Sequence, residues 1–183
     1  MRAGAHVADV GCGFGASTIL LAQAFPNSTV VGFDYHEASI ETARRRAEAA
    51  GSPANLRFEV ASAADFPGYD FDLVCVFDAL HDMGDPVGAA RHIRGALAPT
   101  GTFMFVEPMA GERLDDNVNL VGRMFYSVAP FICTAHARAQ GGPLALGNQV
   151  SDSTWQQLMQ AAGFGRFRRA TETPFNRVYE VRP

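Results

Sequence analysis

A glycine-rich turn near the N-terminus carries the first residues that could hold a ligand. Gly11, Gly13 and Gly15 follow the apolar run Val7–Val10 and precede a helical run. Glycine at such a turn lets the backbone bend sharply and approach a bound molecule with no Cβ in the way. Asp34 ends the next apolar run, 19 residues after Gly15. Because a carboxylate there can accept hydrogen bonds from both ribose hydroxyls, the pattern predicts a nucleoside-binding loop.

The glycine spacing alone leaves two classes of cofactor open. Gly11-x-Gly13-x-x-Ala16 satisfies the dinucleotide pattern, and Gly11-x-Gly13-x-Gly15 is equally a loop used for S-adenosylmethionine. Asp9, two residues before the loop, favours the second class. A carboxylate there suits a cationic sulfonium amino acid and would repel a pyrophosphate.

His81 is the strongest candidate for a residue that moves a proton. It lies in residues 79–82, directly after the apolar run 71–77, at the sheet edge where ligands bind. Imidazole titrates near neutral pH and can accept a proton from a hydroxyl group. The alternative is a capping or packing histidine. His136, within residues 108–150, could meet a substrate, although an exposed loop position is the favoured interpretation.

Strand-like and helix-like segments alternate along the chain. Segments typical of strands are residues 7–10, 29–33, 56–60, 71–77 and 102–106, and segments typical of helices are 16–25, 37–50 and 86–97. Strands joined by helices of this length imply right-handed βαβ crossovers and a parallel sheet. The C-terminal runs 164–171 and 175–181 have no helix between them, so we expect them to pair as an antiparallel unit at one sheet edge.

The alternation stops between residues 108 and 150, a mixed stretch that contains Gly, Pro and large apolar residues. An insertion of this length inside a domain is typical of a lid, a substrate-binding segment or an oligomer contact. After it, Ser153-Thr154-Trp155-Gln156 is typical of a capping box and predicts a helix that ends at Gly163. We therefore expect one domain over residues 1–183 with an insertion at 108–150.

Composition excludes several classes of function. The chain has 183 residues, of which 48% are hydrophobic and 19% are charged, enough for a buried core. Its net charge of −4 predicts no nucleic-acid or membrane-surface partner. All 15 basic residues are arginine, which excludes Schiff-base and P-loop lysines. No apolar run approaches a membrane span, and the N-terminal apolar stretch is too short for a signal peptide, so we expect a cytoplasmic protein.

The cysteines give no sign of a metal site or a disulfide framework. Cys12, Cys75 and Cys133 are odd in number and far apart, and none forms a C-x-x-C pair. Cys12 and Cys75 lie in apolar surroundings and are typical of small core-filling side chains. The sequence therefore predicts no metal.

Taken together, the motifs resemble those of class I S-adenosylmethionine-dependent methyltransferases over nearly the whole chain. The matching segments are residues 7–15, 31–34, 60–67, 71–74 and 97–101. The resemblance implies a Rossmann-like, mostly parallel seven-stranded sheet with helices on both faces and an antiparallel last strand. It also implies S-adenosyl-L-methionine as the cofactor.

The resemblance also implies a role for each cofactor-binding residue. Asp9, Gly11 and Gly13 would hold the methionine part, and Asp34 would hold the ribose. Ser62 and Ala63 would lie at the adenine, and Phe77 and Asp78 would border the cofactor. Gly15 and Tyr35 are also expected to bind the cofactor. The family often has an aspartate where this chain has Ser62. The adenine amino group would then depend on Ser62, on nearby Asp65 or on backbone.

Residues 80–82 resemble the Leu-His-Asp-Trp segment of small-molecule O-methyltransferases, in which the histidine is the base, with Met83 here at the Trp position. Glu107 matches a glutamate that orients this histidine in that subgroup. The implied reaction is methyl transfer to a small molecule, with an oxygen nucleophile as the expected acceptor. An NAD(P)-dependent oxidoreductase and a non-catalytic cofactor-binding core remain the alternatives.

The N-terminal start of the chain bears on its expected assembly. In the bacterial subgroup that the chain resembles, a winged-helix-like domain precedes the core and mediates dimerisation. Here only six residues precede the first predicted strand. We therefore expect a truncated form, or a cover supplied by another chain, with a homodimer as the candidate assembly.

Overall fold

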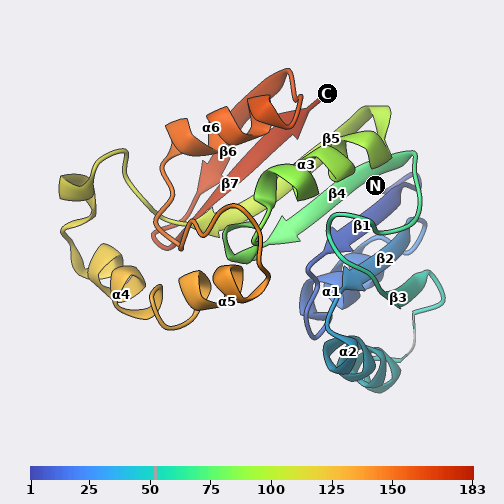
Figure 1. Ribbon diagram of the computed structural model, residues 1–183. Coiled ribbons are helices and arrows are strands. Elements are labelled where there is room, and N and C mark those ends of the chain that lie inside the picture. The colour runs from blue at the N-terminus through green and yellow to red at the C-terminus, as the bar shows by residue number, and fades with distance from the viewer. Residues whose placement is uncertain (52) are drawn as a thin grey trace.

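The computed structural model describes residues 1–51 and 53–183. It contains a seven-stranded sheet with the order β3-β2-β1-β4-β5-β7-β6 (Figure 1). The strands are β1 (His6–Val10), β2 (Thr29–Asp34), β3 (Leu56–Val60), β4 (Phe71–Phe77), β5 (Leu97–Pro108), β6 (Arg166–Glu172) and β7 (Asn176–Arg182). The helices are α1 (Ala16–Ala24), α2 (Glu37–Ala49), α3 (Pro86–Ala96), α4 (Leu120–Val128), α5 (Cys133–Ala139) and α6 (Asp152–Ala161).

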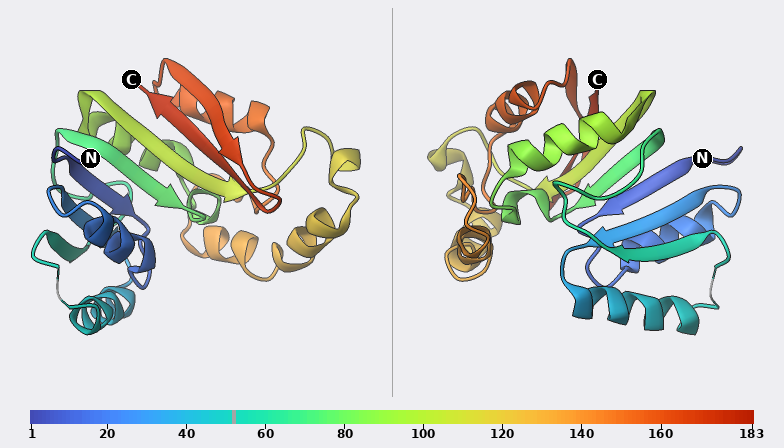
Figure 2. Two further views of the ribbon diagram at one scale, coloured as in Figure 1. Left: turned by 180° about the vertical axis from the view of Figure 1, so that it is seen from behind. Right: turned by 45° about the vertical axis from the view of Figure 1, so that its right-hand side comes forward.

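The strand directions confirm the predicted α/β class. β1 pairs in parallel with β2 and β4, β2 with β3, and β4 with β5. β7 runs antiparallel to both β5 and β6, so the last strand is antiparallel and the C-terminal hairpin forms one edge of the sheet. Helices α1 and α2 lie on one face, and α3 and α6 lie on the other (Figures 1 and 2). Right-handed crossovers on either side of β1 require this arrangement.

The largest core cluster lies between the sheet and the helices α3 and α6. Trp155 and Met159 of α6 are fully buried, as are Phe103 and Phe105 of β5 and Tyr179 of β7. Phe105 meets the Trp155 ring edge-on at 5.3 Å and stacks on Tyr179 at 4.7 Å between ring centroids. This aromatic packing fixes β5 and β7, whose ends carry residues of the candidate site.

Helix α6 begins one residue before the predicted capping box. Ser151 is its N-cap, and the Ser151 hydroxyl accepts a hydrogen bond from the amide of Thr154 at 3.2 Å. The hydroxyl of Ser153 instead donates to the carboxylate of Glu112 at 2.5 Å. The capping pattern therefore predicted the helix correctly but placed its N-cap two residues too late. Ser151 caps the helix, and the Ser153 hydroxyl is bound to Glu112 of the insertion.

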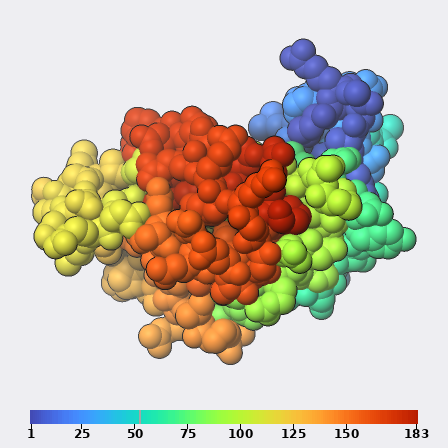
Figure 3. Space-filling model, turned by 90° about the horizontal axis from the view of Figure 1, so that it is seen from above, coloured from blue at the N-terminus to red at the C-terminus, as the bar shows by residue number. Residues whose placement is uncertain are grey.

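The insertion lies beyond the carboxyl ends of β4 and β5 (Figures 1 and 2). It carries a 3₁₀ turn at Leu114–Asn117 followed by α4 and α5. The part before α5, yellow in Figure 3, projects from the side of the molecule, whereas α5 contacts the 3₁₀ turn Leu80–Asp82 after β4. Among the described residues, no helix is long and apolar enough to cross a membrane.

Candidate active site

The glycine loop joins β1 to α1 in a conformation that favours glycine. Gly11, Gly13 and Gly15 have φ angles of 72°, 53° and 76°. The amide of Gly11 donates to the carbonyl of Phe33 at 2.8 Å, which holds the loop against the end of β2. A Cβ at Gly15 would lie 2.6 Å from the ring of Phe58, whereas nothing lies within 4 Å of one at Gly13. Gly15 therefore serves the packing of the loop, and Gly13 leaves open space beside it.

Asp34 ties the loop to the second strand. Its Oδ2 accepts a hydrogen bond from the amide of Gly13 at 2.9 Å, and its Oδ1 accepts one from the amide of His36 at 2.9 Å. Each carboxylate oxygen can accept a second hydrogen bond, and Asp34 lines the main cavity. The carboxylate can therefore hold the loop and a ribose at the same time.

Asp9 lies beneath the loop and is only 1% exposed. Its Oδ2 accepts hydrogen bonds from the hydroxyls of Ser17 at 2.6 Å and Thr18 at 2.7 Å, in the first turn of α1. Burial raises the pKa of the Asp9 carboxyl, although these hydroxyls oppose the shift. Asp9 does not line the cavity, so its direct contribution is to position α1 behind the glycines.

A cavity of about 910 Å³ opens where these elements meet. Five of the predicted cofactor-binding residues line it, namely Gly11, Asp34, Tyr35, Ser62 and Ala63. Five do not, namely Asp9, Gly13, Gly15, Phe77 and Asp78. The Ser62 hydroxyl donates to Asp65 at 2.8 Å, so these two residues form one polar group at the predicted adenine end.

Asp78 follows β4 in a conformation that is uncommon for a residue with a side chain. Its φ angle is 55°, and its amide donates to the carbonyl of Val106 at 2.8 Å. Such backbone strain persists where the surrounding structure over-determines it, and it is concentrated at functional sites. The strained turn directs the chain from β4 into the 3₁₀ turn that carries His81.

The insertion, predicted as a lid or substrate-binding segment, supplies one wall of the cavity, but of its lining residues the sequence singled out only His136. His136, Ala139, Gln140 and Gly142, in and after α5, all line it. The Gln140 side chain accepts from the amide of Gly84 at 3.1 Å and donates to the carbonyl of Asp82 at 2.9 Å. Helix α5 is thereby docked on the segment after β4, and no local sequence pattern shows that contact.

The backbones of Gly84 and Gly142 touch at this docking point. A Cβ at Gly142 would collide with the carbonyl oxygen of Gly84, and that same oxygen accepts a hydrogen bond from the amide of Leu144 at 3.0 Å. Position 142 therefore requires glycine, because the backbone of residue 84 leaves no space for a side chain.

A hydrogen bond between Tyr35 and His136 spans the cavity. The Tyr35 hydroxyl lies 3.0 Å from Nε2 of His136, although the two residues are 101 positions apart in the sequence. Tyr35 follows Asp34 at the end of β2, so this contact joins the insertion to the predicted ribose site. His136 is exposed, as expected, but it lies in α5 and not in a loop, and its contact with Tyr35 could not be predicted because the partner is distant in the chain.

His81 and Glu107 form a buried pair at the ends of β4 and β5. Nδ1 of His81 lies 2.6 Å from Oε2 of Glu107, and the two residues are 3% and 0% exposed. Nε2 of His81 lies 3.1 Å from Oδ1 of Asp82. Burial disfavours the imidazolium, but the neighbouring carboxylates of Asp82 and Glu107 outweigh it and raise the pKa of His81 to about 11. Asp82 lines the cavity, with His81 directly behind it.

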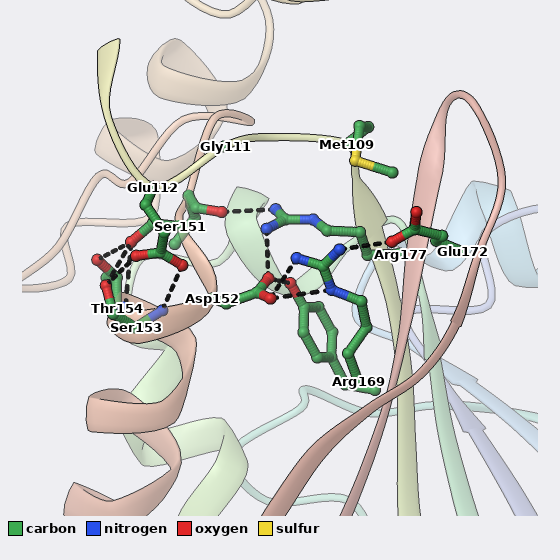
Figure 4. Close-up of polar contacts among 12 residues, drawn as sticks. Met109, Gly111, Glu112, Ser151, Asp152, Ser153, Thr154, Arg169, Glu172 and Arg177 are labelled. Carbon is green, nitrogen blue, oxygen red and sulfur yellow. Dashed lines mark hydrogen bonds and ion pairs between the residues drawn. The ribbon is translucent and has the colours of Figure 1, made fainter. Parts of the chain in front are cut away.

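A second polar cluster closes the base of the insertion (Figure 4). The guanidinium of Arg177 is fully buried and donates to the carbonyl of Pro108 at 2.9 Å and to that of Val150 at 2.6 Å. Its Nη1 donates to Asp152 at 2.6 Å. Arg169 also pairs with Asp152. One arginine of β7 thus holds both ends of the insertion beside the first residue of α6.

Comparisons with known proteins identify the family of the chain. The family model for the methyltransferase domain matches residues 2–163. The chain is 31% identical, over an alignment 204 positions long with its gaps, to 27-O-demethylrifamycin SV methyltransferase of Amycolatopsis mediterranei, covering 95% of this chain and 75% of that one. It is 35% identical over 108 residues to trans-aconitate 2-methyltransferase of Paracidovorax citrulli, covering 59% of this chain and 40% of that protein.

A solved structure shows the same fold. Human N-acetylserotonin methyltransferase in complex with SAM superimposes with a TM-score of 0.75 at 20% identity, over 97% of this chain and 47% of that chain. The present chain thus spans about half the length of that enzyme. The matched family model, which covers most of the chain, shows that the protein belongs to the methyltransferase domain family.

Proposed function

We propose that the protein transfers a methyl group from S-adenosyl-L-methionine to an oxygen atom of a small molecule. The observation that carries the proposal is one cavity that joins the glycine loop and Asp34 to the end of β4, where Asp82 and His81 lie. Membership of the methyltransferase domain family supports the cofactor, as does the SAM-bound human structure with the same fold.

The chain's own residues account for cofactor binding as follows. Asp34 accepts hydrogen bonds from the ribose, Tyr35 covers it, and Ser62 and Ala63 border the adenine. The backbone at Gly11 and Gly13 leaves room for the methionine part, over the buried carboxylate of Asp9. Since the sulfonium already activates the methyl group, the protein's main task is to align donor and acceptor.

His81 and Glu107 would move the acceptor's proton. In the structure both ring nitrogens of His81 face carboxylates. When the acceptor hydroxyl displaces Asp82 from Nε2, the proton already on Nε2 leaves through Asp82 to solvent, and the neutral nitrogen then accepts the proton of the hydroxyl. The oxygen then forms a bond to the methyl carbon, the carbon–sulfur bond breaks, and S-adenosylhomocysteine leaves. Glu107 keeps Nδ1 protonated and stabilises the imidazolium that forms.

An oxygen acceptor agrees with the name of one relative. The Amycolatopsis mediterranei protein is named 27-O-demethylrifamycin SV methyltransferase. A hydroxyl is a poor nucleophile near neutral pH and gains most from a general base. The buried His81–Glu107 pair supplies such a group, so it supports oxygen over an acceptor that needs no base.

A cytoplasmic location and a homodimer belong to the same proposal. All three cysteines are free and buried, as expected in a reducing compartment. The insertion exposes apolar side chains that a second protomer could cover, including Leu120 at 84% and Phe131 at 83% exposure. Sedimentation equilibrium tests the dimer, and a monomer at all concentrations would contradict it.

Calorimetry with S-adenosylhomocysteine and with NAD tests the cofactor. We expect the first to bind, and Asp34→Ala to weaken binding by about 1–3 kcal/mol through the loss of charged hydrogen bonds. Glu59→Ala, a nearby carboxylate outside the cavity, is the matched control. Binding of NAD alone would support the oxidoreductase alternative. Cofactor binding with no turnover on a panel of phenols and acids would support a non-catalytic core.

A further inference from the structure

Three metal-binding side chains from two separate segments converge beside the cavity. His81 and Asp82 lie in the 3₁₀ turn after β4, and Cys133 is the first residue of α5. One donor atom from each, a nitrogen, an oxygen and a sulfur, lies within 4.8 Å of the others. His81 and Cys133 are buried, at 3% and 6% exposure. The contact between α5 and the turn therefore creates a donor set that neither segment holds alone.

Nε2 of His81 and Oδ1 of Asp82 form an ion pair that leaves lone-pair capacity for a third atom. Nε2 of His81 and Oδ1 of Asp82 are 3.1 Å apart, yet within the described part of the chain Oδ1 is buried and has no hydrogen-bond partner. Two ligands at about 2.0–2.1 Å from a tetrahedral zinc ion lie about 3.3 Å apart. The observed separation is close to that value.

Glu107 supplies the outer support that a histidine ligand needs. Its Oε2 lies 2.6 Å from Nδ1 of His81, which leaves Nε2, 3.1 Å from Oδ1 of Asp82, as the nitrogen available to a metal. A carboxylate on the second ring nitrogen fixes the tautomer and the ring orientation in metal sites. Glu107 is fully buried, which keeps that orientation rigid.

We propose that His81, Asp82 and Cys133 form a binding site for a zinc-type transition-metal ion. The mixed nitrogen, oxygen and sulfur donors favour Zn²⁺ over Mg²⁺ or Ca²⁺, which take oxygen ligands. On binding, the metal displaces the proton from Nε2 and the proton from the thiol, and both go to solvent. A water molecule completes the tetrahedron on the cavity side, where Asp82 is partly exposed.

Metal binding would have two consequences for the molecule. It would fasten α5 to the turn after β4 and so close the insertion over the cavity. It would also occupy Nε2 of His81, the atom to which the proposed reaction sends its proton. Zinc is therefore an inhibitor of methyl transfer, while the binding site itself does not depend on the proposed function.

Cobalt(II) spectroscopy of the whole chain tests the site without cofactor or acceptor. We expect one equivalent of Co²⁺ to give intense visible bands of a tetrahedral ion and a thiolate-to-cobalt charge-transfer band in the near ultraviolet, both removed by one equivalent of Zn²⁺. Cys133→Ser should lose the charge-transfer band. Cys12→Ala, also a buried cysteine but outside the cluster, should keep it.

Two further variants test the site independently, in case Cys133→Ser fails to fold. Asp82→Asn, at a partly exposed position, should weaken zinc binding measured by competition with a chelating dye. Glu107→Gln should weaken it roughly 10- to 100-fold through the lost support of His81. A spectrum of hydrated octahedral cobalt, or a charge-transfer band that survives Cys133→Ser, would overturn the proposal and leave the methyltransferase proposal untouched.

Discussion

Two clusters of buried charge flank the insertion, and they differ in how fully their polar groups are satisfied. Around Arg177, the guanidinium donates to two carbonyls and to Asp152, and Asp152 also accepts from Tyr179 at 2.5 Å. Around His81, the buried Oδ1 atom of Asp82 forms an ion pair with Nε2 of His81 at 3.1 Å but has no hydrogen-bond partner in the described residues. The polar groups around Arg177 all have hydrogen-bond partners, whereas the Oδ1 atom of Asp82 can still bind another atom.

This difference separates a structural role from a chemical one. A buried charge whose donors and acceptors are all paired holds its surroundings in one arrangement. A buried group with an unused lone pair beside a cavity can exchange partners as a ligand arrives. We therefore expect changes near His81 to alter turnover, and changes near Arg177 to alter stability.

The largest expected effect is on turnover. His81→Gln should lower kcat roughly 10²- to 10⁴-fold by removing the proton acceptor, and should leave the affinity for S-adenosylhomocysteine nearly unchanged. Single-turnover kinetics and calorimetry measure the two quantities. His92→Gln is the control, because His92 lies on α3 and contacts the carbonyl of Phe66 outside the main cavity. Unchanged turnover in His81→Gln would remove the base from the mechanism.

The next effect is on stability. Arg177→Ala should lower the free energy of unfolding by about 3–5 kcal/mol, because Asp152 and two buried carbonyls lose their partner. Urea denaturation measures the change. Arg168→Ala, an exposed arginine on β6 that pairs with Glu180, should change it by less than about 1 kcal/mol. Equal losses in the two variants would mean that the buried cluster has no special role.

A smaller effect is expected on the pH dependence of the free energy of unfolding. Burial opposes the charge of Asp152, but hydrogen bonds from Tyr179 and Arg169 and the charge of Arg177 outweigh it and lower the pKa of the carboxyl. The stability from ionised Asp152 is therefore complete above the unfolded pKa of about 3.9 and is lost as the pH falls through the lower folded pKa.

Asp152→Asn should consequently be about 1.5–3 kcal/mol less stable than the unchanged protein near neutral pH, with the difference disappearing in acid. Denaturation series at several pH values measure it. Glu180→Gln, at the exposed pair with Arg168 and Arg182, should show a smaller difference. A gap between Asp152→Asn and the unchanged protein that persists in strong acid would contradict the assigned cause.

The smallest expected effect is on the rate of cofactor release, through the hydrogen bond between Tyr35 and His136. Tyr35→Phe removes the hydrogen bond to His136, a loss of about 0.5–1.5 kcal/mol. If this contact holds α5 over the bound cofactor, release of S-adenosylhomocysteine should accelerate roughly 2- to 10-fold in stopped-flow experiments. Tyr69→Phe, at an exposed loop residue, is the control. An unchanged release rate would show that α5 does not limit the exit of the cofactor.

Local sequence patterns sufficed for the sheet and the glycine loop. The apolar runs of β1 and β4, the turn at residues 11–15 and Asp34 are all close in sequence to the elements they define. The predicted meeting of His81 with Glu107 is present at 2.6 Å, because His81 follows β4 and Glu107 lies near the end of the adjacent parallel strand β5. Their catalytic roles stay predictions.

The contacts of the insertion could not be predicted, because they depend on residues distant in the chain. Arg177 lies in an alternating strand and has the sequence character of a surface residue, yet its carbonyl partners at Pro108 and Val150 bury it completely. The docking of Gln140 on Gly84 has no periodic signal either. The Cys133 thiol reaches His81 only through this docking.

The position of Arg177 makes the insertion an exchangeable unit. Since a single side chain binds the carbonyls of Pro108 and Val150, the two junctions of the insertion lie next to each other on the sheet. A segment from a related enzyme could be grafted between them without lengthening any strand, provided that it keeps a glycine to face Gly84. Such chimaeras offer a direct route to redesigning which molecules the enzyme accepts.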